Sequence, residues 1–180
     1  MKWYPVFAKA THVSDGFVAK NWGMLLCCAG ILGGVFAGTI SDRIFGSRRG
    51  PVAAILYAGM LAGTALMFGV LAGPALGWTV IFMSLCVIGV HGMLSGTASM
   101  DFGGKKNVGV VVGIIDGFVY LGTAAQAWVL KQVLPDGDAA ADPLAWHTWP
   151  TAMLPVVVIG LLLAIRVWNA TARKGAAQAH

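Results

Sequence analysis

Five long runs of apolar residues divide this chain, and they constrain its fold more than any other feature. They cover residues 22–41, 51–73, 77–100, 107–130 and 149–170. A helix needs about 20 mostly apolar residues to cross the hydrocarbon core of a bilayer. Because each run is long enough, the sequence predicts an all-α polytopic membrane protein with five transmembrane helices.

The composition excludes an ordinary water-soluble core. Of the 180 residues 58% are hydrophobic and only 11% are charged, whereas a soluble domain carries roughly a quarter charged residues. The runs have no polar faces for a soluble helical bundle, and their lengths do not suit strands. We therefore expect one transmembrane domain over residues 1–180, with residues 171–180 as a cytoplasmic tail.

Several classes of function lack the residues they need. The net charge is +5, but the basic residues lie at the ends of the runs and no basic and aromatic stripe suggests nucleic-acid binding. Cys27, Cys28 and Cys86 lie inside apolar runs and show no metal-ligand spacing. There is no Ser/His/Asp order, no phosphate-binding glycine loop and no carboxylate pair. We expect no enzyme activity, no metal, no cofactor and no nucleic-acid partner.

The charged loops predict the orientation in the membrane. Cytoplasmic loops carry an excess of Lys and Arg. One side receives Arg43, Arg48, Arg49, Lys105, Lys106, Arg166, Arg173 and Lys174. The other side receives Lys2, Lys9, Lys20 and Lys131, offset by Asp15, Asp136, Asp138 and Asp142. We expect a multi-pass protein of the inner (plasma) membrane, with the N-terminus outside and the C-terminus in the cytoplasm.

Glycines recur at four-residue intervals in the apolar runs. Such stripes allow helices to approach closely in lipid, where no hydrophobic force drives them together. We expect close helix packing, and in second place helix bending, at the glycines of four stripes: Gly30, Gly34 and Gly38; Gly59 and Gly63; Gly92 and Gly96; Gly109, Gly113 and Gly117.

A compact charged loop joins the first two runs. It reads Gly38-x-x-x-Asp42-Arg43, followed after a short gap by Arg48-Arg49-Gly. Gly38 is expected to permit close helix contact, and Asp42 to face the positive N-terminus of a neighbouring helix. The pattern resembles the cytoplasmic loop signature of the major facilitator superfamily. That resemblance implies a latch, formed by Gly38, Asp42, Arg43, Arg48 and Arg49, that biases one side of an alternating-access cycle.

Other motifs resemble the C-terminal half of the organophosphate:phosphate antiporters within that superfamily. This group includes glycerol-3-phosphate and hexose-phosphate transporters. The resemblance implies a phosphorylated small-molecule solute. It also matches Asp101 to an acid of the latch, although an ordinary solvated charge at a helix end explains Asp101 equally well. The motifs in chain order are Trp3-x-Pro5, Lys105-Lys106-x-x-Gly109, Ile114-Ile115-Asp116-Gly117, Tyr120-Leu121-Gly122, and Trp146 to Trp149 followed by Pro155.

The departures from that family are as informative as the matches. The resemblance covers the last five of twelve helices, so the first six and nearly all of the seventh have no counterpart. The family's phosphate-binding arginines lie on the first and seventh helices, and its acid on the eighth falls near Cys27. A Gly-Pro of the tenth is replaced by Val90-His91. We expect either a missing N-terminal half or a homo-oligomer to cover the cavity face.

Two ionisable residues lie inside predicted spans, and Tyr120 lies one turn from the second. His91 and Asp116 lie about 14 Å and about 12 Å from the cytoplasmic ends of neighbouring helices, given a rise of about 1.5 Å per residue. Ionisable residues in a membrane are functional candidates by default. We expect His91 and Asp116 to face each other. They either border a cavity with Tyr120, coupled to proton or solute, or form a structural hydrogen bond between helices. The structural alternative is slightly favoured.

Five further polar residues are expected to serve the interface or the packing of the helices. Lys20 and Lys131 lie at the outer interface, where long side chains usually reach toward water; a role in a solute gate is the lesser alternative. Ser95 and Gln126 are expected to form packing hydrogen bonds more readily than solute contacts. Arg166 is expected to reach the interface in the same way as the lysines.

The sequence therefore supports a C-terminal portion of a secondary transporter for phosphorylated metabolites, inactive without an N-terminal half. The alternative is a non-transporting protein, either a sensor relative of these antiporters or a structural subunit of another membrane complex. A degraded reading frame without independent function is a third hypothesis.

Overall fold

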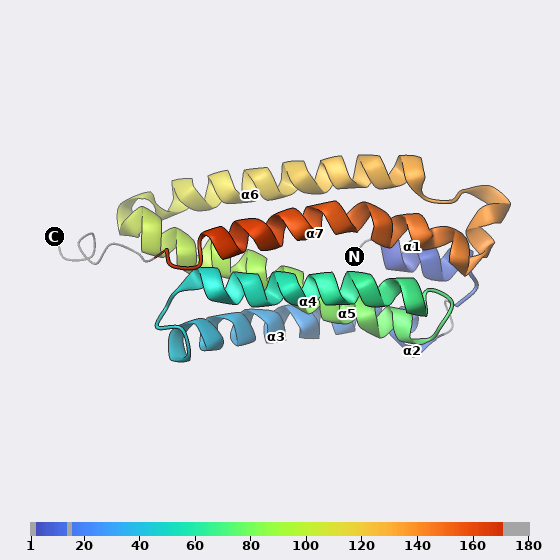
Figure 1. The fold of residues 1–180 in the computed structure, drawn as a ribbon, viewed down its shortest axis with the longest axis horizontal. Helices are drawn as coiled ribbons and strands as arrows, with labels where there is room; N and C mark the ends of the chain where they lie inside the picture. Colours follow the sequence, from blue (N-terminus) through green and yellow to red (C-terminus); the bar gives the residue numbers. More distant parts are fainter. Residues whose placement is uncertain (1–2, 14–15, 171–180) are drawn as a thin grey trace.

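The computed structural model describes residues 3–13 and 16–170, with only the backbone of Phe102 and Lys105 (Figure 1). The described residues form helices and connecting loops, without a strand. The N-terminal part holds two short helices, α1 (Trp3–Ala10) and α2 (Phe17–Lys20). Three long helices follow: α3 (Trp22–Arg43), α4 (Arg49–Val70) and α5 (Ala75–Gly92).

The second part of the chain is less regular. A π-helical segment, η1 (Met93–Ala98), joins α5 to α6 (Ser99–Val133). Inside α6 the chain bends at Gly104, whose φ of 64° and ψ of 174° are not helical. Two 3₁₀ segments, η2 (Gly137–Ala141) and η3 (Pro143–His147), lead to α7 (Thr148–Arg166).

The fold-class prediction is confirmed. Among the described residues, five helical stretches are long and apolar enough to cross a membrane, and each overlaps one of the predicted runs. They are Trp22–Arg43, Arg49–Val70, Ala75–Asp101, Lys106–Val133 and Pro143–Arg166. The third stretch combines α5, η1 and the start of α6, while α7 ends at Arg166, before the end of the predicted run. The expected tail, residues 171–180, lies outside the described residues.

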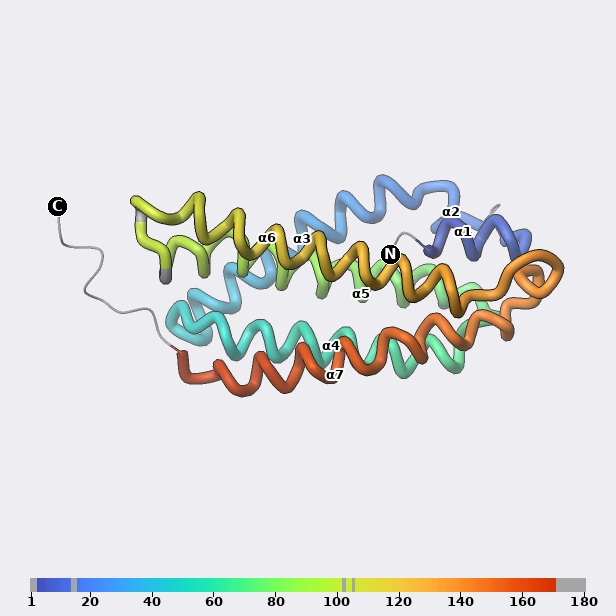
Figure 2. Tube along the Cα trace, turned by 90° about the horizontal axis from the view of Figure 1, so that it is seen from above, coloured from blue at the N-terminus to red at the C-terminus, as the bar shows by residue number. Residues whose placement is uncertain are grey.

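Helix α5 is the centre of the bundle. Both α3 and α4 pack along α5 and contact each other far less, while α7 packs along the other side of α4. A buried core of α4 and α5 side chains, including Leu56, Met60 and Val90, holds these helices together. Figure 2 shows α4 and α7 running side by side, with α6 displaced from both.

The close contact between α3 and α5 involves a glycine outside the predicted stripes. A Cβ added at Gly33 would collide with the backbone of Leu85, and its distance to the Gly89 nitrogen would be 3.2 Å. By contrast, nothing lies within 4 Å of a Cβ at Gly34 or Gly38. The expectation that Gly38 permits a close contact is therefore wrong for this chain, because α3 presents Gly33 to α5.

The other predicted glycine stripes also fall into two groups, one packed against a neighbouring helix and one facing open space. Gly59 and Gly63 do lie against α5, where added Cβ atoms would lie 3.0 Å from Cys86 Sγ and 2.5 Å from Met83 Cγ. The two remaining stripes face open space, since nothing lies within 4 Å of a Cβ added at Gly92, Gly96, Gly109, Gly113 or Gly117.

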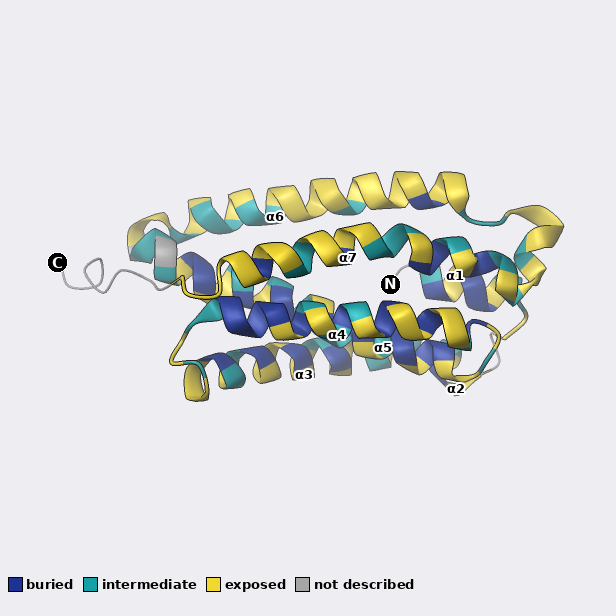
Figure 3. Cartoon of the chain, viewed as in Figure 1, coloured by how far each residue is buried: buried dark blue, intermediate teal, exposed yellow. Residues whose placement is uncertain are grey.

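Helix α6 contacts the rest of the described bundle mainly near its first turns. None of its most apolar window is buried, and it contacts η1 much more than α7. Figure 3 shows α6 exposed along most of its length, on the side of the molecule opposite α3. Large side chains such as Phe118 and Leu121 are exposed on it.

Candidate functional site

The charged loop between α3 and α4 turns sharply through two residues with positive φ. Gly46 has φ of 56° and Ser47 has φ of 64°, a left-handed conformation that costs little for glycine but is uncommon for other residues. The turn is closed by a hydrogen bond from the Ser47 nitrogen to the Ser41 carbonyl oxygen, 2.8 Å long. It brings the first residue of α4, Arg49, back beside the last turn of α3.

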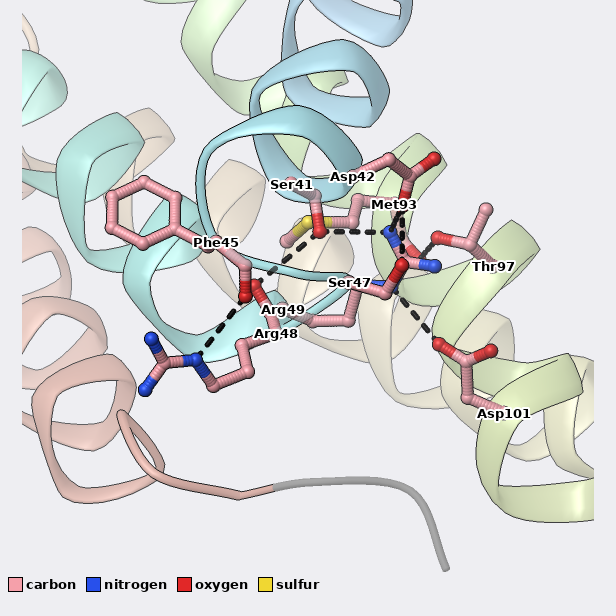
Figure 4. Close-up of polar contacts among 9 residues, drawn as sticks. All are labelled: Ser41, Asp42, Phe45, Ser47, Arg48, Arg49, Met93, Thr97 and Asp101. Carbon is pink, nitrogen blue, oxygen red and sulfur yellow. Dashed lines mark hydrogen bonds and ion pairs between the residues drawn. The ribbon is translucent and has the colours of Figure 1, made fainter. Parts of the chain in front are cut away.

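Arg49 joins the ends of three helices (Figure 4). Its Nη1 donates to Asp42 Oδ1 at 2.9 Å and to Ser41 Oγ at 2.8 Å, both on α3. Its Nε donates to Asp101 Oδ2 at 2.9 Å, in the first turn of α6. The guanidinium is well shielded, with 12% of the side chain exposed, whereas Asp101 is 29% and Asp42 is 56% exposed. We call Ser41, Asp42, Arg49 and Asp101 the Arg49 cluster.

The two carboxylates differ in their surroundings. Asp42 also accepts a hydrogen bond from Ser47 Oγ at 2.9 Å. It meets side chains here, where the sequence predicted an encounter with the positive end of a helix. Because exposed ion pairs contribute only about 0–1 kcal/mol, the more shielded contact between Arg49 and Asp101 is expected to be the stronger one. Such an arrangement can hold three helix ends together and still release them reversibly.

The structure separates the remaining loop residues from this cluster. Arg48 Nε donates to the Phe45 carbonyl oxygen at 3.2 Å, while Arg43 is exposed and Gly38 makes no close contact. Asp101, which the sequence placed near Lys105 and Lys106, has Arg49 as its partner. Whether these residues act as a gate stays a prediction.

A second polar group lies within the spans, where α5 passes into η1. Ser95 Oγ donates to Asp116 Oδ1 at 2.6 Å and lies 3.5 Å from His91 Nδ1. His91 Nε2 is 3.9 Å from the same Asp116 oxygen. The side chains of His91 and Asp116 are 39% and 33% exposed. The predicted proximity of His91 and Asp116 is therefore present, with Ser95 between them.

The π-helical backbone of η1 positions Ser95 in this group. Short π segments widen a helix by one residue per turn and often occur at functional sites. Ser99 Oγ donates to the Leu94 carbonyl oxygen at 2.9 Å, five residues earlier. The Ser99 hydroxyl thus supplies a donor to a backbone carbonyl oxygen of the π segment.

Tyr120 does not join this polar group. It lies one turn beyond Asp116 on α6 and is 69% exposed. Two cavities of about 250 Å³ each lie between α5, α6 and α7; His91 and Gln126 line one, and Gln126, Thr123 and Trp3 line the other. The roles of His91, Asp116 and Tyr120 toward a solute stay predictions.

Sequence reasoning missed the serines at the Arg49 cluster; for Ser95 it expected a packing hydrogen bond but did not name His91 and Asp116 as its partners. Ser41 and Ser47 anchor the Arg49 cluster, and Ser95 bridges His91 and Asp116. Ser95 follows His91 by four residues, the spacing at which side chains share a helix face, so that signal was available. Ser47 carried no such signal, because its position depends on the turn. The described residues contain no group of three or more His, Cys, Asp or Glu able to hold a metal ion.

Comparison with known proteins gives several relatives. The chain is 28% identical over 146 residues to a probable hexose phosphate transport protein of Chlamydia trachomatis, covering 79% of this chain and 30% of that protein. It is 26% identical over 173 residues to the glycerol-3-phosphate transporter of Bacillus subtilis, covering 93% and 36%. It is 33% identical over 134 residues to the membrane sensor protein UhpC of Escherichia coli, covering 73% and 30%.

These relatives confirm the resemblance that the motifs indicated. The chain spans about a third of the length of the curated relatives it matches. No protein-family model matches the chain, and no solved structure matches it.

Proposed function

We propose that this chain, a relative of the organophosphate:phosphate antiporters of the major facilitator superfamily, is the C-terminal portion of a secondary transporter for phosphorylated metabolites. The solute is of the sugar phosphate or glycerol 3-phosphate class, as the names of two relatives suggest. Transport follows alternating access, in which two bundles rock around a midplane site.

The Arg49 cluster carries this proposal. One guanidinium contacts carboxylates on α3 and α6 at 2.9 Å each, on the loop that bears the superfamily signature. Alternating access requires helix ends on one side of the membrane to be held together in one state and released in another. Partly exposed ion pairs suit that task, because water replaces each contact at a small cost in free energy.

The polar group in the middle of the spans would border the solute path. His91, Ser95 and Asp116 lie where α5 widens into η1, and a third or more of the His91 and Asp116 side chains stays accessible. Tyr120 extends the accessible polar surface along α6. Ionisable groups in a membrane are rare because they are costly, and those that occur mark solute and ion pathways.

A partner is part of the proposal. Helix α6 is exposed along its apolar window, and the relatives are about three times longer than the matched region. We expect an N-terminal half, or a second copy of this chain, to cover the cavity face. The arginine end of the bundle would face the cytoplasm, with the N-terminus of the chain outside, in the inner membrane.

Transport by purified protein tests the proposal. The tagged chain is isolated in mild detergent from its native membrane together with whatever accompanies it, and the sample is reconstituted into vesicles loaded with inorganic phosphate. We expect uptake of labelled glucose 6-phosphate or glycerol 3-phosphate, lost in Arg49→Gln and retained in Arg166→Gln. A purified complex that binds neither solute and exchanges no phosphate would contradict it.

A sensor function is the second candidate. The similarity to UhpC, at 33% identity, favours it specifically. A sensor would bind the solute without moving it, so binding without uptake in the same vesicles would support this alternative. Recovery of the chain within an unrelated membrane complex would instead support a structural subunit.

A further inference from the structure

An apolar groove runs along the outside of the bundle, on the face opposite α6. It lies between α3 and α4, because both helices pack on α5 and contact each other little. Its volume is about 770 Å³, and its walls are formed by side chains such as Leu32, Phe36 and Ile55. Gly59 of α4 and the buried Cys86 of α5 also line it.

The groove covers only one half of the membrane. On α3 no residue before Leu32 lines it, and on α4 none after Gly59 does. From Leu32 to Ile40, the last α3 residue that lines the groove, the helix rises about 12 Å at about 1.5 Å per residue. A single leaflet contributes about half of the roughly 30 Å hydrocarbon core. The groove is therefore about as long as one leaflet is thick, whereas a spanning helix would need a groove more than twice as long.

A basic side chain lies at the open end of the groove. Thr39 lines it, and Arg43 follows Thr39 by four residues and Phe36 by seven, so all three share one face of α3. Arg43 is exposed, and the described residues offer its side chain no hydrogen bond or ion pair. It thus has a free positive charge at the level where lipid headgroups lie.

We propose that this groove binds one acyl chain of a phospholipid whose anionic headgroup contacts Arg43. The apolar walls accept the hydrocarbon chain, and the guanidinium pairs with the phosphate. Arginines near the membrane surface attract anionic lipids, and basic pockets between transmembrane helices bind their headgroups. The occupant is a lipid of the leaflet on the arginine side, and the site is independent of any solute path between α5 and α6.

Native mass spectrometry of the full chain tests this site. The chain is reconstituted into nanodiscs with equal amounts of phosphatidylglycerol and phosphatidylcholine and then released in mild detergent. We expect one phosphatidylglycerol to stay bound. Val35→Trp, which fills the groove from an exposed wall position, should reduce that complex at least fivefold. Arg43→Gln should reduce the preference for the anionic lipid about fivefold, the effect of one basic residue near the surface.

Two matched control variants test whether the loss of lipid is specific to the groove. Ile31→Trp adds the same ring to an exposed α3 position outside the groove, and Lys131→Gln removes a charge at the other end of the bundle. Both should retain the bound lipid. The proposal is overturned if they lose it as Val35→Trp and Arg43→Gln do, or if all four variants retain it equally. The spectrum could instead show a dimer of the chain that becomes a monomer in the Val35→Trp variant. That result would assign the groove to a second copy of the chain and would likewise overturn the proposal.

Discussion

At the arginine end of the bundle one guanidinium joins three helices, whereas at the opposite end short segments bury aromatic rings. There Trp146 and Trp149 are each 1% exposed, and Phe7 of α1 lies edge-on to Trp146 with ring centroids 5.3 Å apart. Trp146 Nε1 also donates to the Ala140 carbonyl oxygen at 3.0 Å.

The two ends differ in how far water compensates for the contacts that are lost when the helices separate. Separating charged groups at the arginine end exposes them to solvent that compensates much of the loss. Separating the aromatic rings exposes apolar surface of roughly 150–250 Å² per ring, for which water offers no compensation. This difference predicts that separating the helices costs less free energy at the arginine end than at the aromatic end.

Trp149→Ala should have the largest effect, because it removes a fully buried ring from the aromatic end. We expect the free energy of unfolding in mixed micelles to fall by about 3–5 kcal/mol, typical of a buried aromatic truncation. Hydrogen exchange should rise in α1 and η3 and stay unchanged in the loop before Arg49. Trp128→Ala, at a side chain that is 67% exposed, should change stability by less than about 0.5 kcal/mol.

Arg49→Gln should come next, since it leaves the partly buried Asp101 without its partner. We expect a loss of about 1.5–3 kcal/mol, the range for hydrogen bonds to charged groups, with faster exchange confined to the end of α3 and the starts of α4 and α6. Arg166→Gln, at an exposed residue, provides the control. A loss as large as that of Trp149→Ala would break the comparison between the ends.

Gly33→Ala tests the scaffold that the two ends share. Its methyl group would meet the Leu85 backbone, and overpacking of this kind costs about 1–3 kcal/mol. The neighbouring Gly34→Ala meets nothing within 4 Å and should be neutral in the same unfolding assay. Equal effects of the two variants would show that α3 does not pack on α5 through Gly33.

The smallest effects separate the two acids of the Arg49 cluster. Asp101→Asn should lower stability by roughly 0.5–1 kcal/mol, and Asp42→Asn by less, because Asp42 is the more exposed partner. A double-mutant cycle with Arg49→Gln measures both couplings. A larger coupling energy for Asp42 than for Asp101 would reverse the ranking.

Much of the candidate site was accessible from the sequence, because it depends on local order and depth. His91 and Asp116 were expected at similar depth on neighbouring helices, and they lie 3.9 Å apart. The choice of Arg49 over Arg43 and Arg48 was not accessible. It depends on the left-handed turn at Gly46 and Ser47, which returns Arg49 to the end of α3, and on the position of Asp101 at the start of α6.

The sequence by itself determined the number and approximate positions of the spanning helices, the charged loop between the first two and the relationship to phosphorylated-metabolite transporters. These follow from hydrophobicity and local motifs, which need no knowledge of neighbours. Only the tertiary structure decided that Gly33, and not Gly38, meets α5, and that Trp146 and Trp149 are buried inside the protein. In lipid no hydrophobic force selects which apolar helix faces meet, so the choice of contacting faces depends on how their shapes fit, and that emerges only when the helices pack.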